Sequence, residues 1–381
     1  MNPFQSLTKE SLGLILLFLS AILLSSMGVF LKKAAAFNIP STELVFFRAI
    51  FQGSFVLVGM FYFKEERKQE QLNRTDVDTS SLYVQQHEPD ILIRYPFGRT
   101  KFEQKVVLFR GIVGACGFIC AFYSFKSLPI GDAICVFSMY PVYTIFMGKV
   151  FLGEPIRWIH LIASFLSITG AVLITGPSFL FSEKDGQSYH DEQYNPMGYI
   201  AALLGGVFAA AVFIFIRKAG KLGLHTLQLL SSWSMFGAIL SVIFGMTLFK
   251  SLEGAWIVPP SGIVYWYIFA YCFIGSIAHF LLNYAGRFCN AGVGSIVRSS
   301  DILWAYLYQV VVFDETPQLA TIMGVLFIIV SLIMIAADKI QSDQTINTKY
   351  CAVDEEQDDE LKIEILDLTM DDDDETAFNI Q

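Results

Sequence analysis

The sequence predicts an all-α integral membrane protein of ten transmembrane helices, arranged as two inverted repeats of five helices each. Hydrophobic residues make up 54% of the 381 residues and charged residues only 16%, which is too apolar for a soluble domain of this length. Ten apolar stretches are long enough to cross a bilayer. When the chain is shifted along itself, polar residues and glycines of the two halves coincide. The lipid bilayer is therefore the solvent of this fold.

The ten expected helices follow from the length of the apolar stretches. Crossing a hydrocarbon core of roughly 30 Å takes about 20 residues as a helix, because every backbone polar group must be paired inside the lipid. Prolines fall between the stretches, where a missing N–H is tolerated. The expected helices are residues 12–36, 41–63, 105–126, 130–151, 156–176, 197–217, 225–249, 263–287, 291–312 and 318–337.

Polar segments divide the chain around these helices. The segments rich in charged residues, Gln, Asn and Ser are expected to be solvated and largely disordered. The resulting division is residues 1–11 as the N-terminal segment, 12–176 as the first repeat with its polar loop 64–104, 177–196 as a linker, 197–337 as the second repeat, and 338–381 as an acidic tail.

The repeat rests on two sequence offsets. The first offset superposes the third and fourth expected helices on the eighth and ninth, and the pairs it brings together include Tyr123 with Tyr284, Gly131 with Gly292, and Glu154 with Glu315. The second offset superposes the first expected helix on the sixth, and it pairs Lys33 with Lys218. Because each half holds an odd number of helices, the second copy enters the membrane from the opposite side. Many secondary transporters share this inverted-topology construction.

The distribution of Lys and Arg predicts the orientation. With the N-terminus in the cytosol, 18 of these residues fall in cytosolic segments, five fall on the other side and three lie within helices. Ten against five remain if residues 64–105 are discounted. Both termini are therefore expected in the cytosol, and the plasma membrane and the endomembranes both remain open as locations.

Five ionisable side chains inside the apolar helices are candidates for a substrate site, because burying such groups in lipid costs several kcal/mol unless they pair or face water. They are Arg48, Arg110, Asp132, Arg298 and Asp301. Arg298 and Asp301 are three residues apart on one helix face and can neutralise each other. Three arginines suit a carboxylate, a phosphate or another anion. The alternative is that each side chain only ties helices together.

Three amphipathic aromatic residues, Tyr123, Tyr143 and Trp304, complete the candidate substrate site. Facing inward, they would suit a polar organic substrate, and packing in the core is the alternative. Small-residue faces on the helices would serve packing within the chain or a homodimer equally well.

The polar segments contain no arrangement of nucleophile and base, no spacing of metal ligands and no phosphate-binding glycine loop. We therefore expect no enzymatic activity, no metal and no cofactor. Much of the acidic charge behind the net charge of −9 lies after residue 350, and no nucleic-acid partner is expected. Residues 350–353 (YCAV) fit a tyrosine-based trafficking signal, which makes trafficking adaptors candidate partners of the tail.

Residues 122–133 (FYSFKSLPIGDA), 140–143 (YPVY) and 151–155 (FLGEP) resemble the EamA pattern of the drug/metabolite transporter superfamily, and most of all the group-G members of solute carrier family 35. The resemblance covers nearly all of residues 12–337. It implies ten helices in two EamA repeats, cytosolic termini and a central substrate cavity. The second half departs from the pattern, since Ile302 follows Asp301 where the family often has Pro, and residues 313–316 read FDET.

These observations together predict a multi-pass membrane transporter. Its cargo would be a small polar metabolite, with an anion favoured by the arginines, and its mechanism would be alternating access of the two halves to a central site. The alternative is a non-transporting membrane scaffold or regulator that acts through its cytosolic loop and acidic tail.

Overall fold

The computed structural model describes residues 3–74, 95–128, 130–176, 196–260, 262–313 and 319–341. Within these ranges the chain is helical, with short turns and no strand. Residues 75–94 of the predicted polar loop, residues 177–195 of the linker, and residues 342–381 of the predicted tail, with the YCAV segment, lie outside the described residues. The chain divides into two compact units, Met1–Leu332 and Ile333–Gln381, and the site described below belongs to the first.

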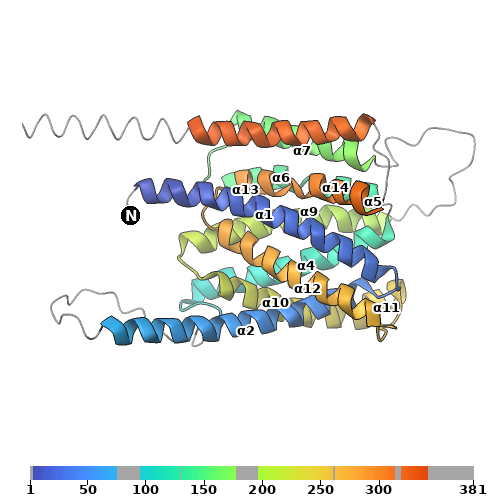
Figure 1. Cartoon of the computed structure of the whole chain (residues 1–381), viewed down its shortest axis with the longest axis horizontal. Coiled ribbons are helices and arrows are strands. Elements are labelled where there is room, and N and C mark those ends of the chain that lie inside the picture. Colours follow the sequence, from blue (N-terminus) through green and yellow to red (C-terminus); the bar gives the residue numbers. More distant parts are fainter. Residues whose placement is uncertain are drawn as a thin grey trace, which may run out of the picture. The chain divides into compact units, whose positions relative to one another are not determined.

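Figure 1 shows the helices of the described residues, coloured in chain order from blue to red. Nine helical stretches of the described residues are long and apolar enough to cross a membrane. The elements are α1 (Pro3–Ala35), α2 (Ser41–Arg74), α4 (Lys101–Ser127), α5 (Ile130–Phe137), α6 (Tyr140–Met147), a π-helical turn (Gly148–Leu152), α7 (Trp158–Thr175), α9 (Pro196–Lys221), α10 (Thr226–Met246), α11 (Leu248–Glu253), α12 (Gly262–Ala285), α13 (Ala291–Arg298), α14 (Asp301–Phe313) and a last helix, Leu319–Gln341.

The expected helix at residues 291–312 is the one that does not qualify as a single membrane-crossing helix. It is broken into α13, of 8 residues, and α14, of 13 residues, with a turn at Ser299 and Ser300. Neither piece alone reaches the roughly 20 residues that a span requires. The break places two helix ends inside an apolar stretch, where backbone hydrogen bonds such as that from the N–H of Ile302 to the carbonyl of Ser299 at 3.3 Å pair groups at the turn.

A second break lies earlier in the chain, within the fourth apolar stretch of the predicted first half. α5 ends at Phe137 and α6 begins at Tyr140, and the first offset leads from these residues to the end of α13 at Arg298 and the start of α14 at Asp301. Pro141 near the start of α6 has no N–H to donate, so it suits the first turn of a new helix. The fourth apolar stretch of each predicted half is therefore broken at the same place.

Helices of the two predicted halves pack directly on one another. α1 contacts α12, α9 contacts α4, and α2 contacts α10. Figure 1 shows α2 along one side of the bundle, with α10 and α12 beside it. In each contact one helix comes from residues before the predicted linker and the other from residues after it.

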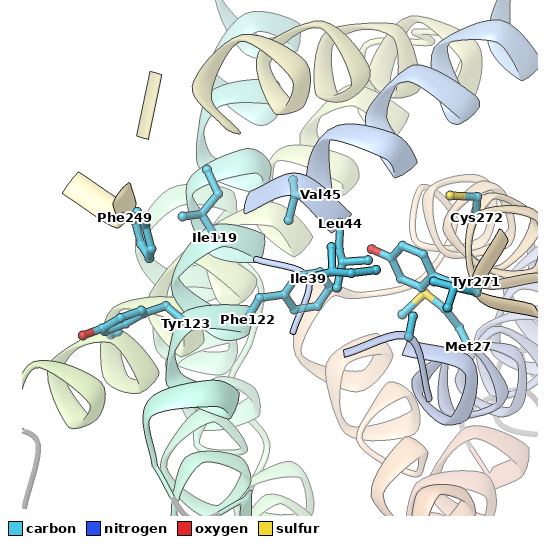
Figure 2. Packing of buried hydrophobic residues seen from close by; sticks show 13 residues of the cluster. Met27, Ile39, Leu44, Val45, Ile119, Phe122, Tyr123, Phe249, Tyr271 and Cys272 are labelled. Atoms are coloured by element: carbon cyan, nitrogen blue, oxygen red, sulfur yellow. The ribbon is translucent and has the colours of Figure 1, made fainter. Parts of the chain in front are cut away.

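A cluster of buried apolar side chains joins α1, α2, α4 and α12 (Figure 2). Tyr123 belongs to this cluster and is only 6% exposed, with its ring packed edge-to-face on Phe249 at 5.1 Å. The labelled members in Figure 2 are Met27, Ile39, Leu44, Val45, Ile119, Phe122, Tyr123, Phe249, Tyr271 and Cys272.

Two glycines allow α7 and the last helix to approach closely. A Cβ atom added at Gly170 would lie 2.6 Å from the carbonyl oxygen of Gly324, and one added at Gly324 would lie 2.6 Å from that of Gly170. We expect Gly170→Ala to lower the free energy of unfolding by about 1–3 kcal/mol, because the two helices must separate. Thermal unfolding in detergent measures this. Gly28→Ala, with no neighbouring atom within 4 Å, is the matched control, and equal melting temperatures for both variants would contradict the prediction.

Candidate functional site

The first unit encloses a cavity of about 930 Å³. This volume is typical of pockets for small molecules. Its lining comes from helices on both sides of the predicted linker, mainly α1, α4, α9 and α14, with fewer residues from helices such as α2, α7 and α12. Lys32 and Gly176, which lie at the carboxyl ends of α1 and α7, also line it, so the cavity extends to that end of the bundle.

Arg48 of α2 lines the cavity and is completely buried. Its Nη2 donates a hydrogen bond to the carbonyl oxygen of Gly275 at 3.0 Å, and its Nη1 lies 2.7 Å from the sulfur of Met27. Its Cζ lies 4.8 Å from the ring centre of Phe118 and 5.4 Å from that of Trp233. Aromatic faces attract cations, so this guanidinium is held by rings and a carbonyl dipole.

Arg110 of α4 is also completely buried and donates to two side chains of α12. Its Nε and Nη2 lie 3.2 and 2.9 Å from Asn283 Oδ1, and its Nη2 lies 2.9 Å from His279 Nε2. An arginine can only donate, so His279 Nε2 accepts, and the imidazole is neutral with its hydrogen on Nδ1. That nitrogen donates to Gln52 Oε1 at 3.0 Å. Every partner of Arg110 in this network is therefore uncharged.

The two buried arginines leave a positive charge beside the cavity. Among the described residues, neither Arg48 nor Arg110 forms an ion pair with a carboxylate. A buried guanidinium without a counter-ion is costly, and its field acts over longer distances in a low-dielectric interior than in water. The arrangement therefore favours an anion in the cavity, which would supply the missing counter-charge.

Arg298 and Asp301 form an ion pair across the break between α13 and α14. Arg298 Nη1 lies 2.7 Å from Asp301 Oδ2, and the two side chains are 12% and 27% exposed. Both line the cavity. Ser25 of α1 donates to the backbone carbonyl of Asp301 at 2.6 Å, which ties the start of α14 to α1. The pair is neutral as a unit, and its carboxylate is the more accessible member.

Four of the eight predicted site residues line the cavity and four do not. The first four are Arg48, Arg110, Arg298 and Asp301. Asp132, among the second four, is completely buried and accepts a hydrogen bond from the hydroxyl of Tyr199 at 2.5 Å, which joins α5 to the first turn of α9.

Two of the three predicted aromatic residues, Tyr123 and Trp304, pack against other elements, and the third, Tyr143, contacts its own helical turn. Tyr123 lies in the apolar cluster with Phe249. Trp304 packs edge-to-face on Phe18 with 5.8 Å between ring centres. The Tyr143 hydroxyl lies 3.8 Å from the sulfur of Met139 on its own helix turn. Aromatic rings pack between helices as readily as they contact a ligand. Their presence in an apolar helix therefore does not distinguish a packing role from a binding role.

Sequence reasoning missed the neutral polar members of the site, namely Gln52, His279 and Asn283. A signal was present in α12, because His279 and Asn283 are four residues apart and so lie on one face of an apolar helix. Polar side chains at membrane depth mark interior faces even when they carry no charge.

A second polar network joins residues from before and after the predicted linker, at the end of the bundle where α9 finishes and α13 begins. Arg217 Nε lies 3.2 Å from Glu154 Oε1, and Glu154 Oε2 accepts from the backbone N–H of Ala291 at 3.0 Å. Arg217 Nη1 also donates to the carbonyl of Arg287 at 2.9 Å. None of these four residues lines the cavity, so the network lies outside it at this end of the bundle.

Comparisons with known proteins agree with this architecture. The model of the EamA-like transporter family matches residues 11–176 and 196–337. Solute carrier family 35 member G1 of Homo sapiens is 24% identical over 322 residues, which cover 84% of this chain and 77% of that protein. A probable transport protein of Saccharomyces cerevisiae is 30% identical over 260 residues, which cover 66% of this chain and 71% of that protein.

Two more distant matches extend the comparison. The pseudopaline exporter CntI of Pseudomonas aeruginosa is 22% identical over 335 residues, covering 86% of this chain and 96% of the exporter. A solved crystal structure superposes with a TM-score of 0.63 at 15% identity, covering 87% of this chain and 98% of the other. At that identity the likeness concerns the fold alone.

Proposed function

The chain belongs to the EamA-like transporter family, and on this premise we propose that it moves a small polar anion across a membrane by alternating access. The observation that carries the proposal is the pair of buried arginines, Arg48 and Arg110, beside a cavity of about 930 Å³ and without carboxylate partners among the described residues. Its relatives are named as a solute carrier, a transport protein and an exporter, which supports transport as the activity.

The preference for an anion follows from the chemistry of the guanidinium groups. Arginine keeps its charge at all physiological pH values and presents a planar set of donors that matches carboxylate and phosphate groups. Burying two such charges in an apolar bundle costs free energy, and charged residues at membrane depth are therefore candidates for a functional site. A bound anion offsets that cost, whereas a cationic cargo would add to it.

Several features support an inverted repeat with ten membrane crossings. The first offset relates the break between α5 and α6 to the break between α13 and α14. The contacts of α1 with α12 and of α9 with α4 are equivalent under exchange of the halves. In such a repeat α13 and α14 together form the crossing that corresponds to α5 and α6.

Side chains at equivalent positions also touch each other. The second offset leads from Arg48 to Trp233, and the first offset leads from Phe118 to His279. The Arg48 Cζ lies 5.4 Å from the Trp233 ring centre, and the rings of Phe118 and His279 are 5.9 Å apart. Contact between equivalent residues is what a two-fold relation between two copies produces on its axis.

The direction in which the cavity opens fits one state of an alternating cycle. The cavity extends to the end with Lys32 and Gly176, while the contacts of Glu154 and Arg217 close the other end. With both termini in the cytosol, as the Lys and Arg distribution predicts, the structure would be open to the non-cytosolic side.

Uptake by proteoliposomes of the purified protein tests this proposal, with labelled organic acids, nucleotide sugars and amino acids and with or without a pH gradient. We expect saturable uptake of one anionic class. Arg110→Gln should reduce it about 30-fold or more, because removing a buried charge contact costs at least about 2 kcal/mol and about 1.4 kcal/mol corresponds to tenfold.

The matched control is Arg99→Gln, at an exposed position outside the cavity, which should leave uptake unchanged. Folded protein without saturable uptake of any class would overturn the proposal and favour the scaffold that acts through the loop and the tail.

A further inference from the structure

Glu154 joins three segments of the chain at the closed end of the cavity. Its two carboxylate oxygens are both engaged, Oε1 by the guanidinium of Arg217 at 3.2 Å and Oε2 by the backbone N–H of Ala291 at 3.0 Å. Glu154 follows the π-helical turn of the first half, while Arg217 lies near the end of α9 and Ala291 begins α13 in the second half. One carboxylate therefore holds the two halves together.

The contact with Ala291 also completes the start of α13. The first N–H groups of a helix have no partner within the helix and attract negative charge. Asn290, at the N-cap position of α13, makes no side-chain capping hydrogen bond, so the cap comes from Glu154 of the other half. Charge-assisted contacts of this kind are stronger than hydrogen bonds between neutral groups.

α13 connects this contact to the cavity. The helix runs for 8 residues from Ala291 to Arg298, about 12 Å at 1.5 Å per residue. Arg298, at its far end, lines the cavity beside Asp301. A cargo that displaces Arg298 must therefore act on the helix whose first N–H is bound by Glu154.

We propose that Glu154 is a latch between the two halves, which holds the cytosolic end closed while the cavity is open to the other side and releases α13 when the transporter turns inward. This inference rests on the proposed function. The latch is suited to breaking, since Glu154 and Arg217 are 11% and 19% exposed and can exchange these contacts for water, unlike the fully buried Arg110. Arg217 keeps its contact with the Arg287 carbonyl when Glu154 leaves, so the released state remains folded.

A native cysteine reports on the latch without any cargo. Cys289 lies just before α13, is 1% exposed and packs against Gly13 of α1. Cys272 is 2% exposed in the apolar cluster and belongs to α12, away from the latch. Labelling of the full-length protein with a maleimide, read at each cysteine by mass spectrometry, therefore separates opening of this end from loss of the fold.

We expect Glu154→Gln to increase the labelling rate of Cys289 at least fivefold and to leave that of Cys272 unchanged. The matched control is Glu103→Gln. Glu103 also binds backbone N–H groups at the start of a helix, but within one half, and this variant should label Cys289 at the wild-type rate. Equal Cys289 rates in the wild type and Glu154→Gln would overturn the latch. A parallel increase at Cys272 would also overturn it, because the contact would then only stabilise the fold.

The labelling experiment and the uptake experiment test the latch and the transport proposal independently. If Glu154→Gln opens the Cys289 end while the wild type takes up no anion, the latch stands and the transport proposal falls. If anion uptake depends on Arg110 while Cys289 labelling is insensitive to Glu154, the transport proposal stands and the latch falls.

Discussion

Replacing Asn283 by aspartate is expected to abolish anion uptake and to leave the protein at least as stable as the wild type. The change is nearly isosteric and places a carboxylate oxygen where Asn283 Oδ1 now lies, 2.9 Å from Nη2 and 3.2 Å from Nε of Arg110. The buried charge of Arg110 would then have a permanent counter-ion with good geometry. An anionic cargo would lose that attraction, and we expect uptake to fall about 30-fold or more, as for loss of a buried charge contact of about 2 kcal/mol.

Uptake by proteoliposomes measures the expected loss of transport, and thermal unfolding in detergent measures the expected stability. Asn38→Asp adds the same charge at an exposed position outside the cavity and should change neither quantity. Wild-type uptake in Asn283→Asp would show that the charge of Arg110 does not act on the cargo. Lower stability with unchanged uptake would assign Arg110 a structural role.

Neutralising the ion pair at the break between α13 and α14 is expected to abolish uptake whether one member or both are changed. Arg298→Gln leaves the Asp301 carboxylate without its cation, and Asp301→Asn leaves Arg298 without its anion. Each single variant should lose about 1–3 kcal/mol of stability, because a partly buried charge becomes unpaired. The double variant removes both charges and should recover that stability, but it should not recover uptake.

The double variant separates the two roles of the pair. If Arg298 and Asp301 only tie helices together, the double variant should transport as the wild type does. If they contact the cargo or move with it, stability returns without transport. Both readouts are made on the same preparations, so a failure to fold cannot be mistaken for a failure to transport.

The positions of the apolar helices could be predicted because they depend on local composition, whereas some helix ends could not, since α2 continues to Arg74 into the predicted polar loop 64–104. The stretch expected at 156–176 is α7 (Trp158–Thr175), and the one expected at 197–217 lies within α9 (Pro196–Lys221). An apolar stretch of about 20 residues has few alternatives to a helix in lipid. The break at Ser299 could not be predicted from local composition. Ser299 forms a 2.8 Å hydrogen bond between its hydroxyl and that of Ser167, which is far away in the sequence.

The charged part of the site could also be predicted, whereas its neutral part could not. A charged side chain in an apolar helix costs free energy unless it is paired or faces water, which makes it a candidate for a functional site. This argument identifies Arg48, Arg110, Arg298 and Asp301. His279 lies far from both Arg110 and Gln52 along the chain, so the spacing of His279 and Asn283 indicates an interior face of α12 but not the side chains that meet it. The sequence predicts Tyr123 at the site, but it lies in the apolar cluster. The presence of an aromatic ring in a helix does not indicate whether the ring contacts a ligand or another helix.

The contact between Arg48 and Trp233 bears on the history of the proposed duplication. In an ancestral homodimer of first-half copies, two arginines would have met at this place in the bilayer, and in one of second-half copies two tryptophans. Two like charges in lipid repel, whereas arginine over an indole ring is attractive. Once the copies had diverged at this position, each half matched only the other. Separately expressed halves should therefore assemble as heterodimers rather than as homodimers of either half.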